Sequence, residues 1–292
     1  MTTMIPWLQD ELRARGPGGS RPVATLLEAG RKTARGDDVS NIKKDICKWY
    51  NFEPELPLKK DMRGFRHDTC GRLLCPTTYD WDKPDIRQAL QRKDKKFDIG
   101  SRNWPNLLWR DEKPDPDDFH VGFLKHELIV KAALRTFRGP TVANSQDGAS
   151  RGTRKSIAAK HGMTEMTAGA IAYCVMMVHF VLSSQAIFGA GGERSSGWAY
   201  RAFYQEIVHY VERQMPRNDR EELFAWWNER IFPEVYTEEY DDDENSSPSA
   251  NSMAAKMIAQ VREREEAAKA GAAEGASASA PLSDSSNTAT VA

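Results

Sequence analysis

The chain has 292 residues and a formal net charge of −1 at pH 7, a length that fits one or two domains. Residues 237–292 carry eleven Asp and Glu against four Lys and Arg, so the rest of the chain is mildly basic. That balance excludes the strongly basic composition of a dedicated nucleic-acid binder. Hydrophobic residues make up 40% of the chain, which is enough to form a buried core in part of it.

The cysteines and the first residues bear on the cellular compartment. Cys47, Cys70, Cys75 and Cys174 show no regular disulfide spacing, and a chain of this length needs no disulfide scaffold. The opening sequence, MTTMIPWLQDELRARG, mixes acids with a few apolar residues and lacks the apolar stretch of a signal peptide. By elimination we expect an intracellular protein, either cytoplasmic or nuclear.

The first 36 residues are predicted to be a weakly ordered N-terminal region. It contains a short helix over residues 23–34 that ends before Gly36, since glycine disfavours helix interiors. Asp37 or Asp38 is then expected to cap a second, amphipathic helix. The apolar positions of that helix recur at helical spacing and are Val39, Ile42, Ile46 and Trp49.

Two long irregular stretches follow, at 51–81 and 97–117, and both contain proline and tryptophan. Loops of this length are usually functional, or are packed against the core by their own apolar residues. Between them, Asp82 at a capping position and Pro84 in the first turn predict a helix that runs to about Arg92.

A further helix is predicted after the second irregular stretch. Asp117 or Asp118 is expected to cap it, and it extends for about twenty residues. Its buried stripe is expected to comprise Phe123, Leu124, Leu128, Ile129 and Ala132. Residues 139–162 are polar and contain glycine, so we expect an exposed loop there.

The centre of the fold is predicted at residues 168–182, which read AGAIAYCVMMVHFVL. A helix that is apolar on every side must be buried by other elements, and Thr164 or Thr167 is expected to cap it. The apolar run extends to residue 188 and approaches the length of a membrane span. His179 would be costly in lipid, so we favour a buried helix and expect no membrane association.

Two more helices, at 198–214 and 219–232, complete the predicted domain. Beyond Tyr236 the sequence EEYDDDENSSPSANS cannot bury enough apolar surface to fold. We therefore expect a mainly α fold, with one irregular helical domain at 37–236 around the central helix at 168–188. Residues 237–292 are predicted to be a disordered acidic, Ala/Ser-rich tail, within which 253–270 has the composition of a short helix.

One group of residues has the chemistry of metal ligands, namely His67, Cys70 and Cys75, with Cys47 upstream. Structural zinc needs four donors held tetrahedrally, commonly with two to four residues between paired cysteines. The interval between Cys70 and Cys75 is one residue longer, and no fourth ligand has a clear place. We therefore favour buried thiols and a bracing histidine, and assign no metal and no cofactor.

No coherent catalytic constellation emerges. The chain has no G-x-S-x-G elbow, and the glycine-rich stretch at 189–197 lacks the ending and the preceding strand of a phosphate-binding loop. His179 is expected to be a core histidine that shares a hydrogen bond. The acidic cluster Asp115, Asp117, Asp118 and His120 is expected to cap a helix. We assign no catalytic residue, and an enzyme built around His67, Cys70 and His161 is a third hypothesis.

Aromatic and basic residues outside the expected core supply the predicted interaction surface. Trp226 and Trp227 point about 100° apart on a helix, so one is expected to pack inward and the other to be available to a partner. The basic loop before residue 161 has the charge to meet phosphates. The complete predicted surface comprises Trp104, Trp109, Trp226, Trp227, Arg151, Arg154 and Lys155.

Short motifs in a fixed order resemble an uncharacterised domain family that is abundant in basidiomycete fungi. They include GFRH at 64–67, LLCP at 73–76, HGMT at 161–164 and the WWN and FP motifs within 226–233. The resemblance covers residues 37–233 and implies that the first irregular stretch and the last helices belong to one domain. It implies no activity, and it is associated with a fungus-specific or mobile-element-linked role.

Two further functional hypotheses remain. The leading one is a non-enzymatic module that binds protein partners, because aromatic residues are abundant in the long loops. The second is association with nucleic acid through the basic body of the chain, with the acidic tail as a masking element. No residue pattern specifies the partner or the oligomeric state.

Overall fold

The computed structural model describes residues 20–145, 156–188 and 198–233. All of them belong to one unit of the chain, which ends at Pro233. The fold is mainly α, as predicted: over the described ranges the backbone forms helices and two isolated β-bridges, and no strand. No helix in these ranges is both long enough and apolar enough to cross a membrane.

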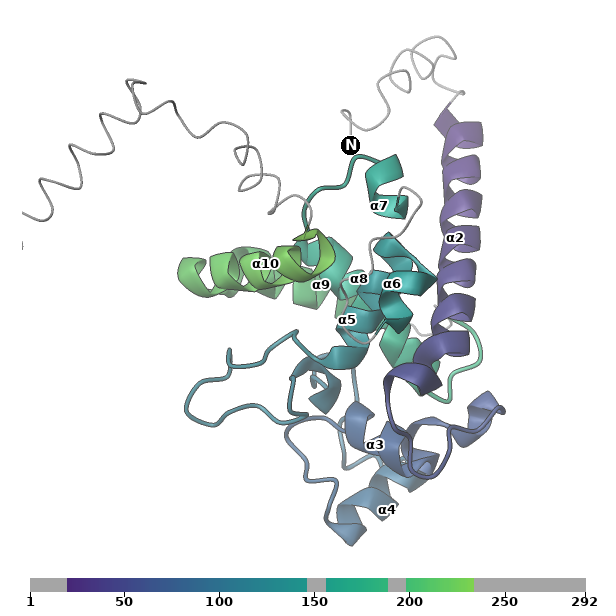
Figure 1. The fold of residues 1–292 in the computed structure, drawn as a ribbon. Helices are drawn as coiled ribbons and strands as arrows, with labels where there is room; N and C mark the ends of the chain where they lie inside the picture. The colour runs from purple at the N-terminus through teal and green to yellow at the C-terminus, as the bar shows by residue number, and fades with distance from the viewer. Residues whose placement is uncertain (1–19, 146–155, 189–197, 234–292) are drawn as a thin grey trace, which may run out of the picture. The chain divides into compact units, whose positions relative to one another are not determined.

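Figure 1 shows how the helices are arranged. The α-helices are α2 (Ser20–Trp49), α3 (Asp68–Leu74), α4 (Pro84–Arg92), α5 (Glu127–Ala133), α6 (Pro140–Asn144), α7 (Ile157–Lys160), α8 (Ala168–Leu182), α9 (Tyr200–His209) and α10 (Arg217–Ile231). Short 3-10 helices are η1 (Lys60–Met62), η2 (Gly64–Arg66) and η3 (Asn106–Leu108). Single π-helical turns, η4 (Leu134–Arg138) and η5 (Tyr210–Gln214), extend α5 and α9.

The central helix α8 spans the apolar stretch 168–182, and it ends before the limit of 188 predicted for the central helix. Thr167 caps it, because the Thr167 hydroxyl accepts a hydrogen bond from the Ala170 N–H at 3.1 Å. Helices α2, α3, α5 and α9 all contact α8, which explains why residues on every side of it are buried. His179 is a buried core histidine, as expected, and its Nδ1 lies 3.1 Å from the Tyr200 hydroxyl.

The C-terminal end of α8 is held by two cations from the proline-containing stretch. Lys60 Nζ donates to the carbonyls of Phe180 and Ser183, and Arg63 donates to the Val181 carbonyl at 2.9 Å. Helix C-termini carry unpaired carbonyls and partial negative charge, so cations stabilise them. Burial and the neighbouring Arg63 lower the pKa of Lys60 to about 7. The stretch at 51–81 is therefore packed onto the core as a cap for α8.

Helix α2 runs without a break through Gly30 and Gly36, so the predicted end before Gly36 is wrong. Residues 24–34 are all exposed, and each glycine in such a helix costs about 1 kcal/mol relative to alanine. Packing of the second half of α2 against α5 and α8 offsets this cost. Tyr173 on α8 adds a hydrogen bond of 2.7 Å to Asp38, the residue predicted to be an N-cap.

The helix predicted to start at Asp117 or Asp118 begins later, with α5 at Glu127. Gly122 and Leu124 both have positive φ angles, 72° and 56°, and a helix cannot pass through left-handed residues. The actual cap is His126, whose Nδ1 accepts a hydrogen bond from Leu128 N–H at 3.1 Å. The predicted stripe is nevertheless buried in full: Phe123, Leu124, Leu128, Ile129 and Ala132.

The region predicted as an exposed loop at 139–162 contains two short helices, so this prediction is wrong in part. Helix α6 buries Val142 and Ala143, and α7 buries Ala158. Asn144 at the end of α6 accepts a hydrogen bond from the Trp49 indole at 2.8 Å. Short apolar patches such as these are hard to distinguish from loop sequence, because they span less than two helical turns.

The other predicted helices have clear counterparts. Helix α4 occupies residues 84–92, with Pro84 in its first turn, although Lys83 and not Asp82 precedes it. Helices α9 and α10 correspond to the two predicted C-terminal helices. Several predictions lie outside the described residues: the glycine-rich stretch at 189–197, the end of the domain at 236, and the acidic tail with its helix at 253–270.

Candidate functional site

The residues considered as metal ligands are used in other ways. His67 caps α3: its Nδ1 accepts from the Cys70 N–H at 3.2 Å, so its Nε2 is the protonated nitrogen and donates to the Pro54 carbonyl at 2.7 Å. Burial raises the pKa of both Cys70 and Cys75 to about 12, whereas metals bind the thiolate. Among the described residues, no three His, Cys, Asp or Glu side chains come together as a metal site.

Of the three residues proposed for an enzyme, His67 and Cys70 are neighbours, whereas within the described ranges no hydrogen bond joins His161 to either of them. His67 and Cys70 belong to α3 and its cap, whereas His161 is exposed directly after α7. Helix α3 packs chiefly against η2, η3 and α8, whereas α7 packs chiefly against η4. Catalytic partners must come within hydrogen-bond reach of one another or of a common substrate.

The four predicted surface tryptophans divide into two pairs. Trp109 and Trp227 are 5% and 0% exposed and belong to the core, so each offers little surface of its own. Trp104 and Trp226 are partly exposed and remain available. The three basic residues of the predicted surface, Arg151, Arg154 and Lys155, lie outside the described part of the chain.

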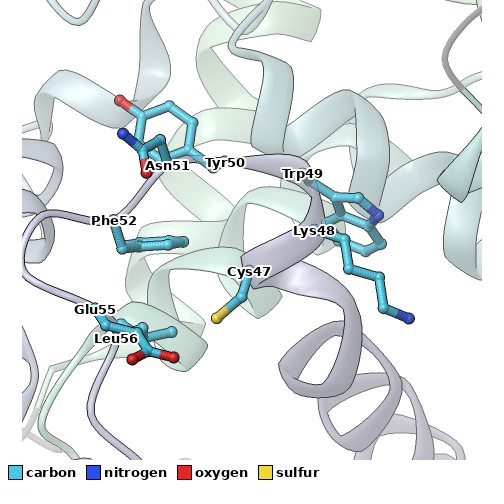
Figure 2. Close-up of a pocket in the computed structure, with 8 residues that line it drawn as sticks. All are labelled: Cys47, Lys48, Trp49, Tyr50, Asn51, Phe52, Glu55 and Leu56. Carbon is cyan, nitrogen blue, oxygen red and sulfur yellow. The ribbon is translucent and has the colours of Figure 1, made fainter.

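Figure 2 shows one pocket, which follows the end of α2 and has a volume of about 420 Å³. Its polar side chains are largely engaged elsewhere, because Lys48 pairs with Asp45 and Tyr50 donates to Glu112. Burial raises the pKa of the Cys47 thiol, which makes it a weaker nucleophile. This pocket therefore offers little specific chemistry. Its lining residues are Cys47, Lys48, Trp49, Tyr50, Asn51, Phe52, Glu55 and Leu56.

A second pocket has walls made mainly of aromatic rings, and we call it the aromatic pocket. Its volume is about 300 Å³, at the lower end of the range for sites that bind small molecules or single side chains. The segments that form it are far apart in the sequence. Its lining residues are Thr77, Thr78, Arg102, Asn103, Trp104, Trp109, Pro114, Phe119, His120, Phe123 and Tyr210.

The rings of the aromatic pocket are fixed by contacts with one another. Trp104 stacks on Phe123, with ring centroids 5.2 Å apart and ring planes at 12°. Tyr210 meets Trp104 edge to face at 5.1 Å, and Trp109 packs against Phe123 at 5.3 Å. Such pairs are favourable beyond the area they bury. Phe119 differs from the rest, because 63% of its surface is exposed. The pocket thus has a wall of packed rings and one strongly exposed ring, that of Phe119.

His120 ties this pocket to α10 and η5. Its Nδ1 lies 2.9 Å from a carboxylate oxygen of Asp219, and its Nε2 lies 2.7 Å from the Tyr210 hydroxyl. A carboxylate only accepts hydrogen bonds, so Nδ1 carries the proton and a neutral ring accepts the Tyr210 proton at Nε2. Burial and the nearby Asp219 raise the pKa of Tyr210. Over the described ranges, no Ser, Thr or Cys is bonded to His120, so this chain of bonds lacks a nucleophile.

The acidic residues around His120 do not cap a helix, contrary to the sequence prediction. Asp115 accepts from the Asp117 N–H at 2.9 Å, and Asp118 accepts from the His120 N–H at 2.9 Å. These are local turns stabilised by aspartate side chains. They shape the irregular backbone that presents Phe119 and His120 at the pocket.

A buried polar network anchors the same segment from its other side. The Glu112 carboxylate accepts hydrogen bonds from Tyr50 and Arg72, and His126 Nε2 lies 3.9 Å away. Burial alone would raise the Glu112 pKa, but these neighbours outweigh it and lower the pKa to about 2. Glu112 also has a left-handed backbone, with φ of 59°. The sequence alone does not reveal this network, because Tyr50 and Arg72 lie 62 and 40 residues from Glu112.

Two capping histidines were also missed, and they share a local signal. His67 precedes Asp68, and His126 precedes Glu127, in each case at a helix start. An acid in the first turn favours the helix N-terminus, and the histidine Nδ1 replaces the usual Ser, Thr, Asp or Asn oxygen. A His-Asp or His-Glu pair before an apolar run is therefore the local sequence pattern that indicates a histidine N-cap.

Residues 29–232 of the chain match the family of unknown function called DUF6698. The chain belongs to this family. The DUF6698 match covers the pocket-forming segments together with α8, and it begins inside α2, before the predicted domain start at residue 37. No curated protein and no solved structure gives a significant match to the chain.

Proposed function

We propose that this domain is a non-enzymatic protein-interaction module, and that a segment of its partner binds in the aromatic pocket. The observation that carries the proposal is the exposed ring of Phe119 beside a wall of packed aromatic rings. Exposed aromatic side chains next to a formed pocket are typical anchors of protein interfaces. The pocket has the size to accept one or two side chains of a partner.

The chemistry around the pocket favours binding over catalysis. Both ring nitrogens of His120 have partners, and the Tyr210 proton is directed to His120. Such a ring orients Tyr210 and does not need to exchange protons with a ligand. A surface on irregular segments that are held by a helical scaffold is the usual arrangement for recognition.

A peptide-display selection with the purified full chain tests the proposal. Peptides that bind are labelled, and their affinities are measured by fluorescence anisotropy with wild-type protein and Phe119→Ala. Loss of a central aromatic anchor costs about 2 kcal/mol or more, so we expect affinity to fall about thirtyfold. Leu58→Ala is the matched control, because Leu58 is 89% exposed and does not line the pocket. Selected peptides that bind Phe119→Ala as well as wild type would contradict the proposal.

A second candidate, association with nucleic acid, is favoured by the surroundings of Trp226. Three cations lie over its ring: Arg230 at 3.9 Å, Lys125 at 5.5 Å and Arg110 at 5.7 Å. Aromatic and basic side chains together can stack bases and neutralise phosphates. Glu222 pairs with Lys125 at 3.5 Å, however, which reduces the local positive charge and makes this the weaker candidate.

Binding of a single-stranded oligonucleotide at several salt concentrations tests the second candidate. If it is correct, affinity falls steeply with salt, Trp226→Ala weakens binding, and deletion of residues 237–292 strengthens it by removing negative charge. An affinity that is unaffected by the deletion would count against the masking role of the tail.

An intracellular setting, cytoplasmic or nuclear, belongs to the same proposal. It is supported by the buried free thiols of Cys70, Cys75 and Cys174, which suit a reducing compartment. The fungus-specific setting rests on the family resemblance alone. Fractionation of cells that produce the tagged protein, with redox-sensitive labelling of the three thiols, would test the compartment.

A further inference from the structure

We infer that the ligand of the aromatic pocket is an acidic peptide segment, whose carboxylate binds Arg102 while a neighbouring apolar side chain packs against Phe119. This inference rests on the proposed function and specifies the chemistry of the partner. The two residues line the same pocket, so one short segment can reach both.

The charges of the pocket lining favour an anion. Arg102 and His120 are its ionisable side chains of basic type, and the lining contains no Asp or Glu. His120 is already paired with Asp219. Arg102 has no carboxylate within 4 Å in the described part of the chain, although its charge acts on Glu206 and partly offsets the rise that burial causes in the Glu206 pKa. A cationic ligand would find no counter-charge in the pocket, whereas a carboxylate would find a guanidinium.

The hydrogen-bond donors of the pocket also favour a ligand that carries a carboxylate. A guanidinium offers several N–H groups in a planar fork that matches a carboxylate. Trp104 also lines the pocket, and its buried indole N–H has no acceptor among the described residues. That indole nitrogen is buried away from solvent, so the exposed Arg102 is the donor that a ligand can reach. A ligand that brings acceptor oxygens is therefore favoured over one that brings further donors.

A peptide fits this lining better than a nucleic acid does. Grooves that follow a phosphate backbone use several cations along their length, together with stacking rings. The aromatic pocket has one cation without a paired carboxylate, and two of its rings, Trp104 and Phe123, are stacked on each other. A peptide with a single carboxylate beside an apolar side chain matches the one unpaired cation, Arg102, and the strongly exposed ring of Phe119.

The test uses short fluorescent peptides in matched sets. Each peptide has a central Trp, Pro or Leu in a Gly/Ser background, flanked by Glu, by Gln or by Lys. Wild-type protein is expected to bind the Glu set about tenfold more tightly than the Gln set, the scale of one charge-assisted hydrogen-bonded contact. Arg102→Gln should remove this preference, and Arg102→Glu should reverse it in favour of Lys. Lys83→Glu is the control, because Lys83 is exposed and does not line the pocket.

The outcomes separate this inference from the proposed function. If peptides bind in a Phe119-dependent manner but Arg102→Glu leaves their charge preference unchanged, the ligand is not selected by its carboxylate and the inference fails alone. If no peptide of any set binds, both fail. A single-stranded oligonucleotide that binds more tightly than every peptide, and depends on Arg102, would assign the pocket to phosphate instead. A reversed preference with Arg102→Glu and an unchanged one with Lys83→Glu would establish the acidic ligand.

Discussion

The central helix α8 and the segment between α4 and α5, residues 93–126, differ in how much polar side chains contribute to holding them in place. Helix α8 is buried on all sides by apolar contacts with four neighbouring helices. The segment at 93–126 contains only the single turn η3 as regular structure. It places Leu107, Leu108 and Leu124 in the core. Polar side chains that reach distant parts of the chain, chiefly Glu112 and His120, fix it in addition.

Because of this difference, we expect α8 to contribute mainly to folding stability and the segment at 93–126 to contribute mainly to recognition. Apolar burial over several helices supplies most of the free energy of folding, so α8 and its neighbours form the scaffold. Irregular segments on such a scaffold can present side chains that a helix would bury. Phe119, Arg102 and His120 are all carried by the polar-anchored segment. Substitutions in the two regions should therefore affect different measurements.

The largest effect on stability is expected in α8. Leu182→Ala removes a fully buried side chain, and substitutions of this kind cost about 3 kcal/mol because of lost burial and the cavity that remains. Urea unfolding at pH 7 measures the change. Ile187→Ala is the control: Ile187 follows α8 in the chain, is 68% exposed, and should change stability by less than about 0.5 kcal/mol. Equal effects of the two substitutions would contradict the role of α8 as the main source of folding stability.

Glu112→Gln should have the next largest effect. It removes the charge that pairs with Arg72 and leaves a partly buried guanidinium without its partner. Because Arg72 keeps some contact with water, we expect a loss of about 2 kcal/mol, less than for a fully buried pair. Urea unfolding, together with hydrogen exchange of residues 109–126, measures both the global and the local change. Unaltered exchange in this segment would show that the network does not anchor it.

The same substitution has a defined pH dependence. The Glu112 pKa is about 2 in the folded protein against an ordinary value of 4.5, so between these values the unfolded chain binds more protons. The stability from the carboxylate is thus fully present above pH 4.5 and is lost as the pH falls toward 2. The difference in unfolding free energy between wild type and Glu112→Gln should therefore shrink across this window. A constant difference would contradict the assigned pKa.

Lys60→Met tests the capped end of α8 and should cost about 1 kcal/mol, since hydrogen bonds to terminal carbonyls are lost. The Lys60 pKa is lowered from 10.5 to about 7, so between these values the unfolded chain binds more protons than the native protein. The buried charge of Lys60 destabilises the folded protein. This cost disappears as the pH rises through the window, because Lys60 then loses its proton. Wild type should therefore gain stability relative to Lys60→Met between pH 7 and 10. The opposite slope would exclude a buried ammonium at this site.

The smallest effect on stability is expected for Tyr210→Phe, which removes the hydrogen bond to His120 and keeps the ring. The free energy of unfolding should fall by about 1 kcal/mol or less. Peptide affinity should fall a few-fold, because the ring and His120 lose their fixed orientation. Tyr204→Phe on α9 is a control that lies outside the pocket lining. A large loss of stability with unchanged affinity would make Tyr210 a scaffold residue and not a positioning residue.

The two regions also differ in how far they could be predicted from the sequence. The stretch 168–182 that forms α8 follows from an apolar run, which is a local property, and Thr167 is one of its two predicted caps. The buried stripe around Leu128 was predicted correctly for the same reason, although the start of α5 was not. Left-handed backbone at Leu124 has no local sequence signal, since leucine rarely adopts it.

The candidate site was predictable only in part. Trp104 and Trp109 were expected to contribute to function and both line the aromatic pocket, yet Phe119 and Arg102 were not singled out. The position of these residues depends on bonds between distant segments, such as Glu112 with Tyr50. Contacts of this kind arise from tertiary packing, which hydrophobic periodicity does not encode.

The most direct measurement of the central claim is a paired determination of peptide affinity and unfolding free energy for Phe119→Ala. An exposed side chain contributes little to folding, whereas an anchor residue contributes strongly to binding. We predict an affinity for the Glu-flanked peptides that falls about thirtyfold, with stability unchanged within about 0.5 kcal/mol. An unchanged affinity for the same peptides would contradict the assignment of the aromatic pocket as the binding site.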